Sequence, residues 1–346
     1  MSRRKRKPEL SLLNVLFCFF VVWIHLLSEP VTALASDTPA WYIAYFVQRI
    51  LFCAIYGFIF LSAVKSFLPN PEEKNISAAM SDTAYTRTIA YYKNRFLRIV
   101  LPYWIAGTVY WAVFYLTGIQ RTAPLAAIGQ LLSGSGAAHF YFIIVIVQFY
   151  ALYPLIQRLV QRQNAGRLLI AAAVLNLLTA VCFYRYAFYN RLFTRYLFCY
   201  IAGALFGTHY DRIRSVLYPY RKWIFILYPI VQGLECAGAY AVRTGRLHPL
   251  PGQLITQICM PFLVLFWYCL VMNASCPAPL RAADRAAYSV YLWHVLFIAL
   301  TDLVIGDIGG TALRMILRSG IVCCAIFILI CLSSALRHYF RKETPV

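Results

Sequence analysis

Charged side chains are scarce in this sequence. They make up 13% of its 346 residues, whereas soluble domains carry about 25%. Hydrophobic residues make up 62%, so the composition excludes an ordinary soluble protein and indicates one embedded in a membrane. Acidic residues are especially few, 12 against 32 Lys and Arg, which leaves a formal net charge of +20. Because no basic soluble module is present to bind nucleic acid, we expect this excess charge in cytoplasmic loops.

Metal-binding patterns are also missing. The 11 cysteines form no Cys-x-x-Cys pair and no Cys/His group at zinc spacing. Most lie in apolar runs, where cysteine behaves as a small hydrophobic residue. We therefore predict no metal site and no permanently bound cofactor. A cleavable signal peptide is not expected either, since the first apolar run is too long and no small-x-small site follows closely.

Ten apolar stretches are long enough to cross a bilayer, which takes about 20 helical residues. We predict an all-α, polytopic transmembrane bundle with about ten spanning helices. No long soluble domain and no internal repeat interrupts them, so residues 10–336 are expected to form one membrane-embedded domain between cytoplasmic tails at 1–9 and 337–346. The predicted spans are 10–28, 41–64, 98–117, 139–159, 168–184, 192–209, 223–242, 253–272, 286–305 and 313–336.

The basic residues predict the orientation. If the N-terminus is cytoplasmic, 23 of the 32 Lys and Arg fall on the inner side, 5 on the outer side and 4 inside spans. The positive-inside rule then places both termini in the cytoplasm and the loops at Gly134 and Gly245 outside.

Few ionisable side chains interrupt the predicted helices, and burying such a group in hydrocarbon is costly enough to mark a candidate site. His25 lies in the outer half of the first helix, about 22 Å from its cytoplasmic start. A similar depth is predicted for Arg49, His139, Arg195, Asp302, Arg314 and Arg318. Together they can line one polar cavity that opens outward. Alternatively, the arginines reach the outer headgroups independently and His25 only makes a hydrogen bond between helices.

A second basic group, Lys93, Arg95 and Arg98, lies on the cytoplasmic side at the start of the third predicted helix. Basic residues at such an entrance can hold a phosphorylated ligand by charge-assisted hydrogen bonds. They are also typical of a cytoplasmic flank that binds anionic lipid. The pattern alone favours the lipid interpretation.

Several motifs, taken together and in this order, resemble the acyltransferase-three family of integral membrane acyltransferases over nearly the whole chain. Phe60-Leu61-Ser62 is similar to an apolar-Ser-Gly segment of the family, although Ala63 stands where glycine is usual. The other stretches that carry the resemblance are 13–15 with 22–25, 92–99 with 101–103, 139–142 with Tyr150 and Pro154, and 288–294.

One departure from the family pattern falls on the first helix. The family places an arginine eleven residues before the histidine of this helix, where this sequence has Asn14. Asparagine supplies neither the charge nor the bidentate fork of arginine. Either another residue has taken over the role, or the donor is bound differently, or the transfer activity is altered.

The resemblance implies transfer of a small acyl group, most often acetyl, from acyl-CoA to a hydroxyl of a carbohydrate or cell-envelope component. It implies that His25 acts as general base, since an imidazole titrates near working pH. Asn14, His139 or Arg49 would orient His25 or stabilise the oxyanion. For His294, a structural role is slightly favoured over a catalytic one.

The binding residues follow from the same resemblance. Lys93, Arg95 and Arg98 would hold the phosphates of acetyl-CoA, and Arg49 and Arg195 are counted with them as substrate- or donor-binding residues. The protein would be an O-acetyltransferase of the cell membrane that modifies an envelope polysaccharide, surrounded by lipid and without a nucleic-acid partner. In the alternative function, a carrier or exporter, the charged outer cavity would be the route of a polar envelope molecule.

Overall fold

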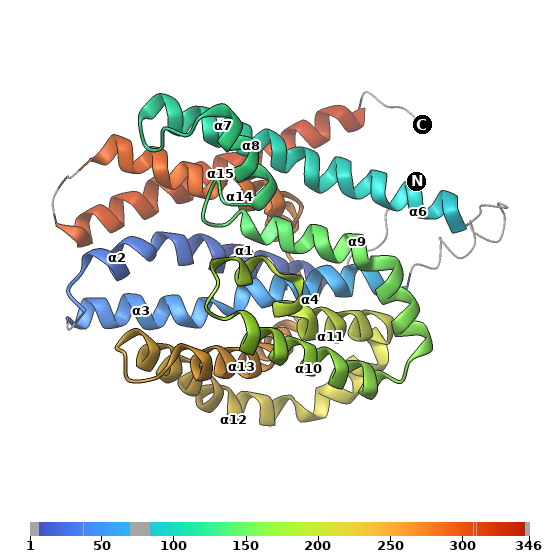
Figure 1. The fold of residues 1–346 in the computed structure, drawn as a ribbon. Helices are drawn as coiled ribbons and strands as arrows, with labels where there is room; N and C mark the ends of the chain where they lie inside the picture. The colour runs from blue at the N-terminus through green and yellow to red at the C-terminus, as the bar shows by residue number, and fades with distance from the viewer. Residues whose placement is uncertain (1–6, 37, 70–83, 307, 309, 343–346) are drawn as a thin grey trace. The chain divides into compact units, whose positions relative to one another are not determined.

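The computed structural model describes residues 7–36, 38–69, 84–306, 308 and 310–342, and the regular elements in these ranges are all helical (Figure 1). This confirms the all-α prediction. Residues 3–6 of the basic tail, the polar segment 70–74 and residues 343–346 lie outside the described residues. In the described ranges nine helical segments are long and apolar enough to cross a membrane: Pro8–Ala33, Pro39–Phe67, Thr88–Thr117, Tyr141–Arg162, Ala165–Phe183, Tyr210–Arg243, Pro249–Val271, Ala278–Ile305 and Thr311–Tyr339.

The helices fall into two compact units, and the chain passes from one unit to the other within α4 (Cys53–Phe67) and within α13 (Pro249–Val271). Unit 2 covers the described residues of 6–55 and 264–346. Its helices are α1 (Pro8–Leu26), α2 (Ser28–Ala33), α3 (Pro39–Leu51), α14 (Ala278–Ile305) and α15 (Thr311–Lys342).

Unit 1 covers residues 56–263. Besides its parts of α4 and α13, it contains α6 (Ala84–Arg95), the π-helix η1 (Phe96–Val100), α7 (Leu101–Thr117), α8 (Pro124–Ser133), α9 (Tyr141–Arg162), α10 (Ala165–Phe183), the short 3₁₀ helices η2 (Ala187–Arg191) and η3 (Phe193–Tyr196), α11 (Leu197–Thr208) and α12 (Tyr210–Arg243).

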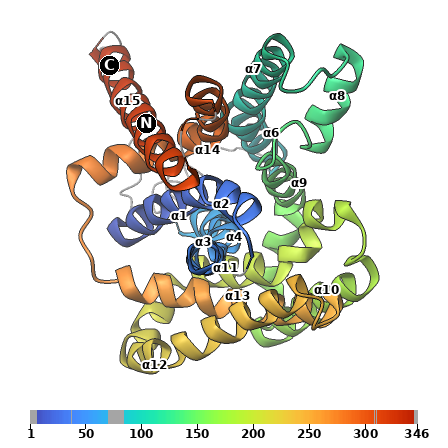
Figure 2. The same ribbon diagram turned by 90° about the vertical axis from the view of Figure 1, so that its left-hand side faces the viewer.

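In unit 2, α1 packs along α14, and the two helices run parallel. Asn14 contacts Asp284, the Cys18 thiol donates to the Ala287 carbonyl at 3.6 Å, and further along both helices His25 lies beside His294. Figure 2 shows α1, α14 and α15 of this unit close together. Parallel packing means that α1 and α14 cross the membrane in the same direction.

The span predicted at 192–209 is shorter in the structure than the sequence suggested. It consists of η3 and α11, and α11 has only 12 residues, about 18 Å of helix. Most of α11 is buried in unit 1, and a Cβ atom at Gly203 would lie 2.5 Å from the Phe60 carbonyl oxygen of α4. Glycine therefore permits the close approach of α11 to α4. Because protein and not lipid encloses it, this helix need not match the thickness of the hydrocarbon layer.

The connection before His139 also contains a helix that the hydropathy pattern did not predict. This helix, α8, ends at Gly134, whose φ of 67° lies in the left-handed region. A Cβ atom there would lie 2.9 Å from the Phe140 carbonyl oxygen. Glycine is required at this turn by both its conformation and its surroundings.

Candidate active site

His25, the histidine singled out from the sequence, lies beside a second histidine inside unit 2. The ring centroids of His25 on α1 and His294 on α14 are 5.1 Å apart, and the ring planes are inclined by 57°. His294 is fully buried, and His25 keeps a small exposed surface. The sequence motif around His294 thus lies beside His25, and a catalytic role of His294 stays a prediction.

The backbone of α14 determines which nitrogen of His294 carries hydrogen. Nδ1 lies 2.8 Å from the Tyr291 carbonyl oxygen and 3.2 Å from that of Val290. A carbonyl oxygen only accepts, so Nδ1–H is the donor, and in the neutral ring Nε2 keeps the lone pair. The ring of His294 is therefore held in one orientation and offers a basic nitrogen in the neighbourhood of His25.

Asn14, the other predicted catalytic residue of the first helix, contacts α14 far from His25. Its Nδ2 donates to Asp284 Oδ1 at 2.8 Å, and Ser11 Oγ donates to Asp284 Oδ2 at 2.9 Å. Asp284 is buried. Asn14 and His25 are eleven residues apart, about 16 Å along the helix. The contact therefore fixes the register of α1 against α14, and a catalytic role of Asn14 stays a prediction.

A network of four charged residues lies one helical turn beyond His25. Arg318 of α15 donates to Glu29 Oε2 of α2 and, at 2.9 Å, to Asp302 Oδ2 of α14, while Arg314 Nε lies 3.0 Å from Glu29 Oε1. The network joins three helices, and its formal charges balance. Arg318 is buried.

This network corrects one interpretation from the sequence. Arg314 and Arg318 do not reach headgroups independently, because both bind carboxylates of unit 2. Glu29 was not singled out from the sequence, although it stands four residues after His25, the spacing that places two side chains on one helix face.

Gln48 of α3 holds the chain at the end of α1. Its Nε2 donates to the Ile24 carbonyl oxygen at 2.9 Å and to Ser28 Oγ at 3.2 Å. The next residue, the predicted site residue Arg49, places its guanidinium 4.8 Å from the centre of the Phe52 ring. Arg49 therefore belongs to the same unit as His25, and its part in binding stays a prediction.

The second basic group, Lys93, Arg95 and Arg98, lies in unit 1, and its members differ in how far they are exposed. The guanidinium of Arg95 is 4.5 Å from the centre of the Tyr150 ring and 5.1 Å from that of Tyr91, and its Nη2 donates to Ser66 Oγ at 3.3 Å. Arg95 thus ties α6 to α4 and α9. Lys93 and Arg98 are exposed. These two residues are the more accessible to a ligand in water.

The π-helix η1 begins directly after Arg95 and contains Arg98. Its wider turn breaks the regular α-helical spacing between the two arginines. In a regular α-helix, residues three apart lie on one face. The π-helix explains why one of these arginines packs among tyrosines and the other faces outward.

His139, the third predicted catalytic residue, is almost completely buried in unit 1, in the turn before α9. Its ring lies 4.4 Å from that of Phe140 and 5.8 Å from that of Tyr110, measured between centroids. These surroundings are aromatic. A catalytic role of His139 stays a prediction.

Arg195, another predicted binding residue, lies in η3 of unit 1 among tyrosines. Its guanidinium carbon is 4.7 Å from the centre of the Tyr189 ring and 5.9 Å from that of Tyr196. Gln257 Nε2 donates to the Tyr189 hydroxyl at 3.2 Å, and Asn176 donates to Gln257 at 3.1 Å. Burial raises the pKa of Tyr189 to about 12, although the charge of Arg195 opposes the rise. Tyr189 is therefore neutral at physiological pH.

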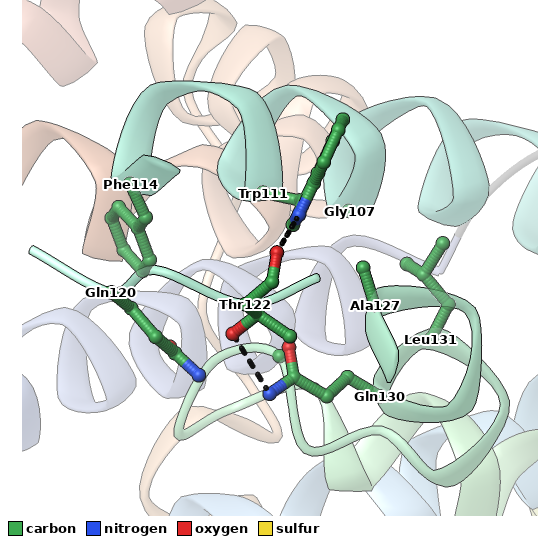
Figure 3. A pocket seen from close by; sticks show the side chains of 9 residues that line it. Gly107, Trp111, Phe114, Gln120, Thr122, Ala127, Gln130 and Leu131 are labelled. Atoms are coloured by element: carbon green, nitrogen blue, oxygen red, sulfur yellow. Dashed lines mark hydrogen bonds between the residues drawn. The ribbon is translucent and has the colours of Figure 1, made fainter. Parts of the chain in front are cut away.

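A small cavity between α7 and α8 is too small to be a substrate site. Figure 3 shows Trp111 Nε1 donating to the Thr122 carbonyl oxygen, at 2.9 Å, and Gln130 pointing toward the Thr122 hydroxyl. The volume is about 10 Å³, which is room for about one water molecule.

The fold and the site together define a class: a membrane-embedded helical protein with paired titratable side chains between two of its helices. Residues 7–338 match the acyltransferase domain of the Acyltransferase 3 family. The chain belongs to this family, which confirms the resemblance and implies a transferase that uses an acyl donor. No curated protein and no solved structure matches the chain.

Proposed function

We propose that the protein transfers a small acyl group, with acetyl as the first candidate, from acyl-CoA to a hydroxyl of a carbohydrate or another cell-envelope component. The observation that carries this proposal is the His25–His294 pair between α1 and α14 in a chain of an acyltransferase family. Acyl transfer to a hydroxyl needs a base at the attacking oxygen, and imidazole is the side chain best suited to that task near neutral pH.

In the proposed step, His25 takes the proton of the acceptor hydroxyl while the oxygen attacks the thioester carbonyl. The tetrahedral intermediate then collapses, the carbon–sulfur bond breaks, and the proton on His25 passes to the departing thiolate of coenzyme A. The products are the ester and free coenzyme A, and no oxidant or reductant is consumed. His294 is proposed to orient His25, since its own ring is fixed by the backbone of α14.

The negative charge that develops on the thioester oxygen needs fixed donors. Arg49, which lies in the same unit as His25, is proposed for this role. Asn14 is proposed to act at a distance by holding α1 against Asp284. This contact joins α1 to α14 without the charge of the arginine that the family places there.

Release of coenzyme A tests the proposed function. Membranes that contain the protein are given acetyl-CoA labelled in the acetyl group, with and without an envelope carbohydrate fraction. We expect free thiol to appear and label to enter alkali-labile esters in equal amounts, only when the fraction is present. Thiol release without ester formation would indicate hydrolysis of the thioester and contradict transfer.

The donor's phosphates are proposed to bind Lys93, Arg95 and Arg98. Arg98→Ala should raise the KM for acetyl-CoA about tenfold or more with little change in kcat, because it removes a charge-assisted hydrogen bond to the bound donor. Arg98→Lys should recover only part, since an ammonium does not reproduce the guanidinium fork. Steady-state kinetics of both variants measure this.

Arg158→Ala serves as the matched control, since Arg158 is likewise exposed at a predicted cytoplasmic helix end. Its KM should stay at the wild-type value. If Arg98 only contacts anionic lipid, Lys will replace it fully, and Arg98→Ala will reduce insertion and leave the KM unchanged.

Both termini are proposed to be cytoplasmic, on the distribution of basic residues and the parallel course of α1 and α14. Single cysteines can test this at Ser135 and Arg246 in outer connections and at Arg158 on the inner side, in a background without the exposed native cysteines. Ser135 is preferred to Gly134, where any side chain would be strained. An impermeant thiol reagent should label Ser135→Cys and Arg246→Cys in intact cells, and Arg158→Cys only in opened ones. The reverse pattern would contradict the orientation.

A further inference from the structure

Arg195 and the tyrosines around it form a second polar centre, inside unit 1. We propose that this centre binds the carboxylate or phosphate group of an anionic ligand. The binding of an anion at Arg195 does not rest on the proposed acyl transfer.

Arg195 is partly exposed, but two of its donor nitrogens are enclosed, and no ion pair in the described part of the chain balances its charge. Its Nε and Nη1 atoms are shielded from solvent and have no hydrogen-bond acceptor, and no carboxylate of the described residues lies within ion-pair distance of it. The sequence predicts a similar depth in the membrane for Arg318, but Arg318 binds both Glu29 and Asp302. Arg195 therefore differs from the structural arginine of unit 2 in lacking a counter-charge.

The tyrosines do not supply that counter-charge. Tyr189 and Tyr196 are almost completely buried, and a phenol is neutral at physiological pH. Their rings attract the guanidinium through their faces. Such contacts are weaker than an ion pair, and a cation whose donor atoms are shielded from water is stabilised by an anion beside it.

The surrounding hydrogen bonds leave a donor for a ligand. Gln257 donates to the oxygen of Tyr189, so the hydroxyl proton of Tyr189 points elsewhere. Gln257 is fixed in turn by Asn176. A guanidinium fork next to a hydroxyl donor matches the oxygens of a carboxylate or phosphate, and an anion bound there would balance the charge of Arg195.

Ligand titration can test this independently of catalysis. The purified protein in phosphatidylcholine nanodiscs is titrated with inorganic phosphate, glucuronate and glucose, and the thermal unfolding midpoint is followed. Phosphate and glucuronate should raise the midpoint, and glucose, which has no charge, should not. Arg195→Gln should weaken the apparent affinity for glucuronate about tenfold or more, and Arg195→Lys should weaken it less.

Two further variants keep the test decisive. Tyr189→Phe keeps the ring and removes the hydroxyl, so it should weaken binding even if Arg195→Gln folds poorly. Arg185→Gln is the matched control, because Arg185 also stacks on a tyrosine, with its guanidinium 5.4 Å from the Tyr184 ring centre, but is exposed. The Arg185→Gln variant should bind glucuronate with the affinity of the wild type.

The outcomes separate this proposal from the proposed function. His25→Gln should bind glucuronate like the wild type, whether or not the wild type transfers acyl groups. Equal binding by wild type, Arg195→Gln and Tyr189→Phe, or no binding by the wild type, would overturn the anion site. Glucuronate binding that persists in nanodiscs containing phosphatidylglycerol would assign the site to a soluble anion, whereas loss of this binding through competition at Arg195 would assign it to a lipid headgroup.

Discussion

His25→Gln and His25→Ala are expected to abolish acyl transfer, with a loss of about 10²–10⁴-fold in kcat, the range typical of a missing general base. Glutamine resembles histidine in size and polarity but cannot take a proton at neutral pH. Because the proposed role lies in the transition state, kcat should fall and the KM for acetyl-CoA should change little. Initial rates with purified protein at saturating donor measure the loss.

The matched control is His248→Ala. His248 is an exposed histidine before α13 whose Nδ1 accepts from the Leu250 amide at 3.3 Å. The His248→Ala variant should retain wild-type activity. A His25→Gln protein that is inserted and folded but fully active would remove His25 from the mechanism.

Arg318→Met is expected to cause the largest loss of stability, because it removes the cation that Glu29 and Asp302 share. Breaking a buried ion pair by removing one partner costs about 3–5 kcal/mol. The side chains of Glu29 and Asp302 are 22% and 28% exposed, so water screens them partly and the loss should lie near the lower end. Glu29 keeps Arg314, whereas Asp302 loses its ion-pair partner. The thermal unfolding midpoint in detergent should fall by several degrees.

Asp302→Asn in the Arg318→Met background should recover part of the loss, since it removes the carboxylate left without a cation. Arg337→Met is the control on the same helix, because the exposed Arg337 donates to the carbonyl oxygens of Ser333 and Arg285. If Arg318→Met were no less stable than Arg337→Met, the network would not hold α2, α14 and α15 together.

Hydropathy was sufficient to predict the long helices, because each is a continuous apolar run that must satisfy its own backbone in lipid. It failed for α11 and α8, for different reasons. The length of α11 is set by close packing on α4 at Gly203, a tertiary contact that no local pattern contains. Helix α8 is too short for a spanning pattern.

His25 could be singled out because a titratable side chain in an apolar run is conspicuous. Its pairing with His294 could not be predicted, since the pair depends on the parallel register of α1 and α14, which Asn14 and Asp284 help to fix. The carboxylates that pair with Arg314 and Arg318 could not be predicted either, because Glu29 and Asp302 lie on other helices.

Ester-linked acetyl on the carbohydrate of the cell envelope is the most direct measure of the proposed transfer. Cells that make the wild-type chain, the His25→Gln chain or neither are grown with labelled acetate, and the alkali-labile label in the envelope carbohydrate is measured. Label that depends on the wild-type chain and is lost in His25→Gln is the predicted result. Equal label in all three, with an unmodified envelope molecule exported only by cells that make the wild-type chain, would contradict acyl transfer and indicate a carrier.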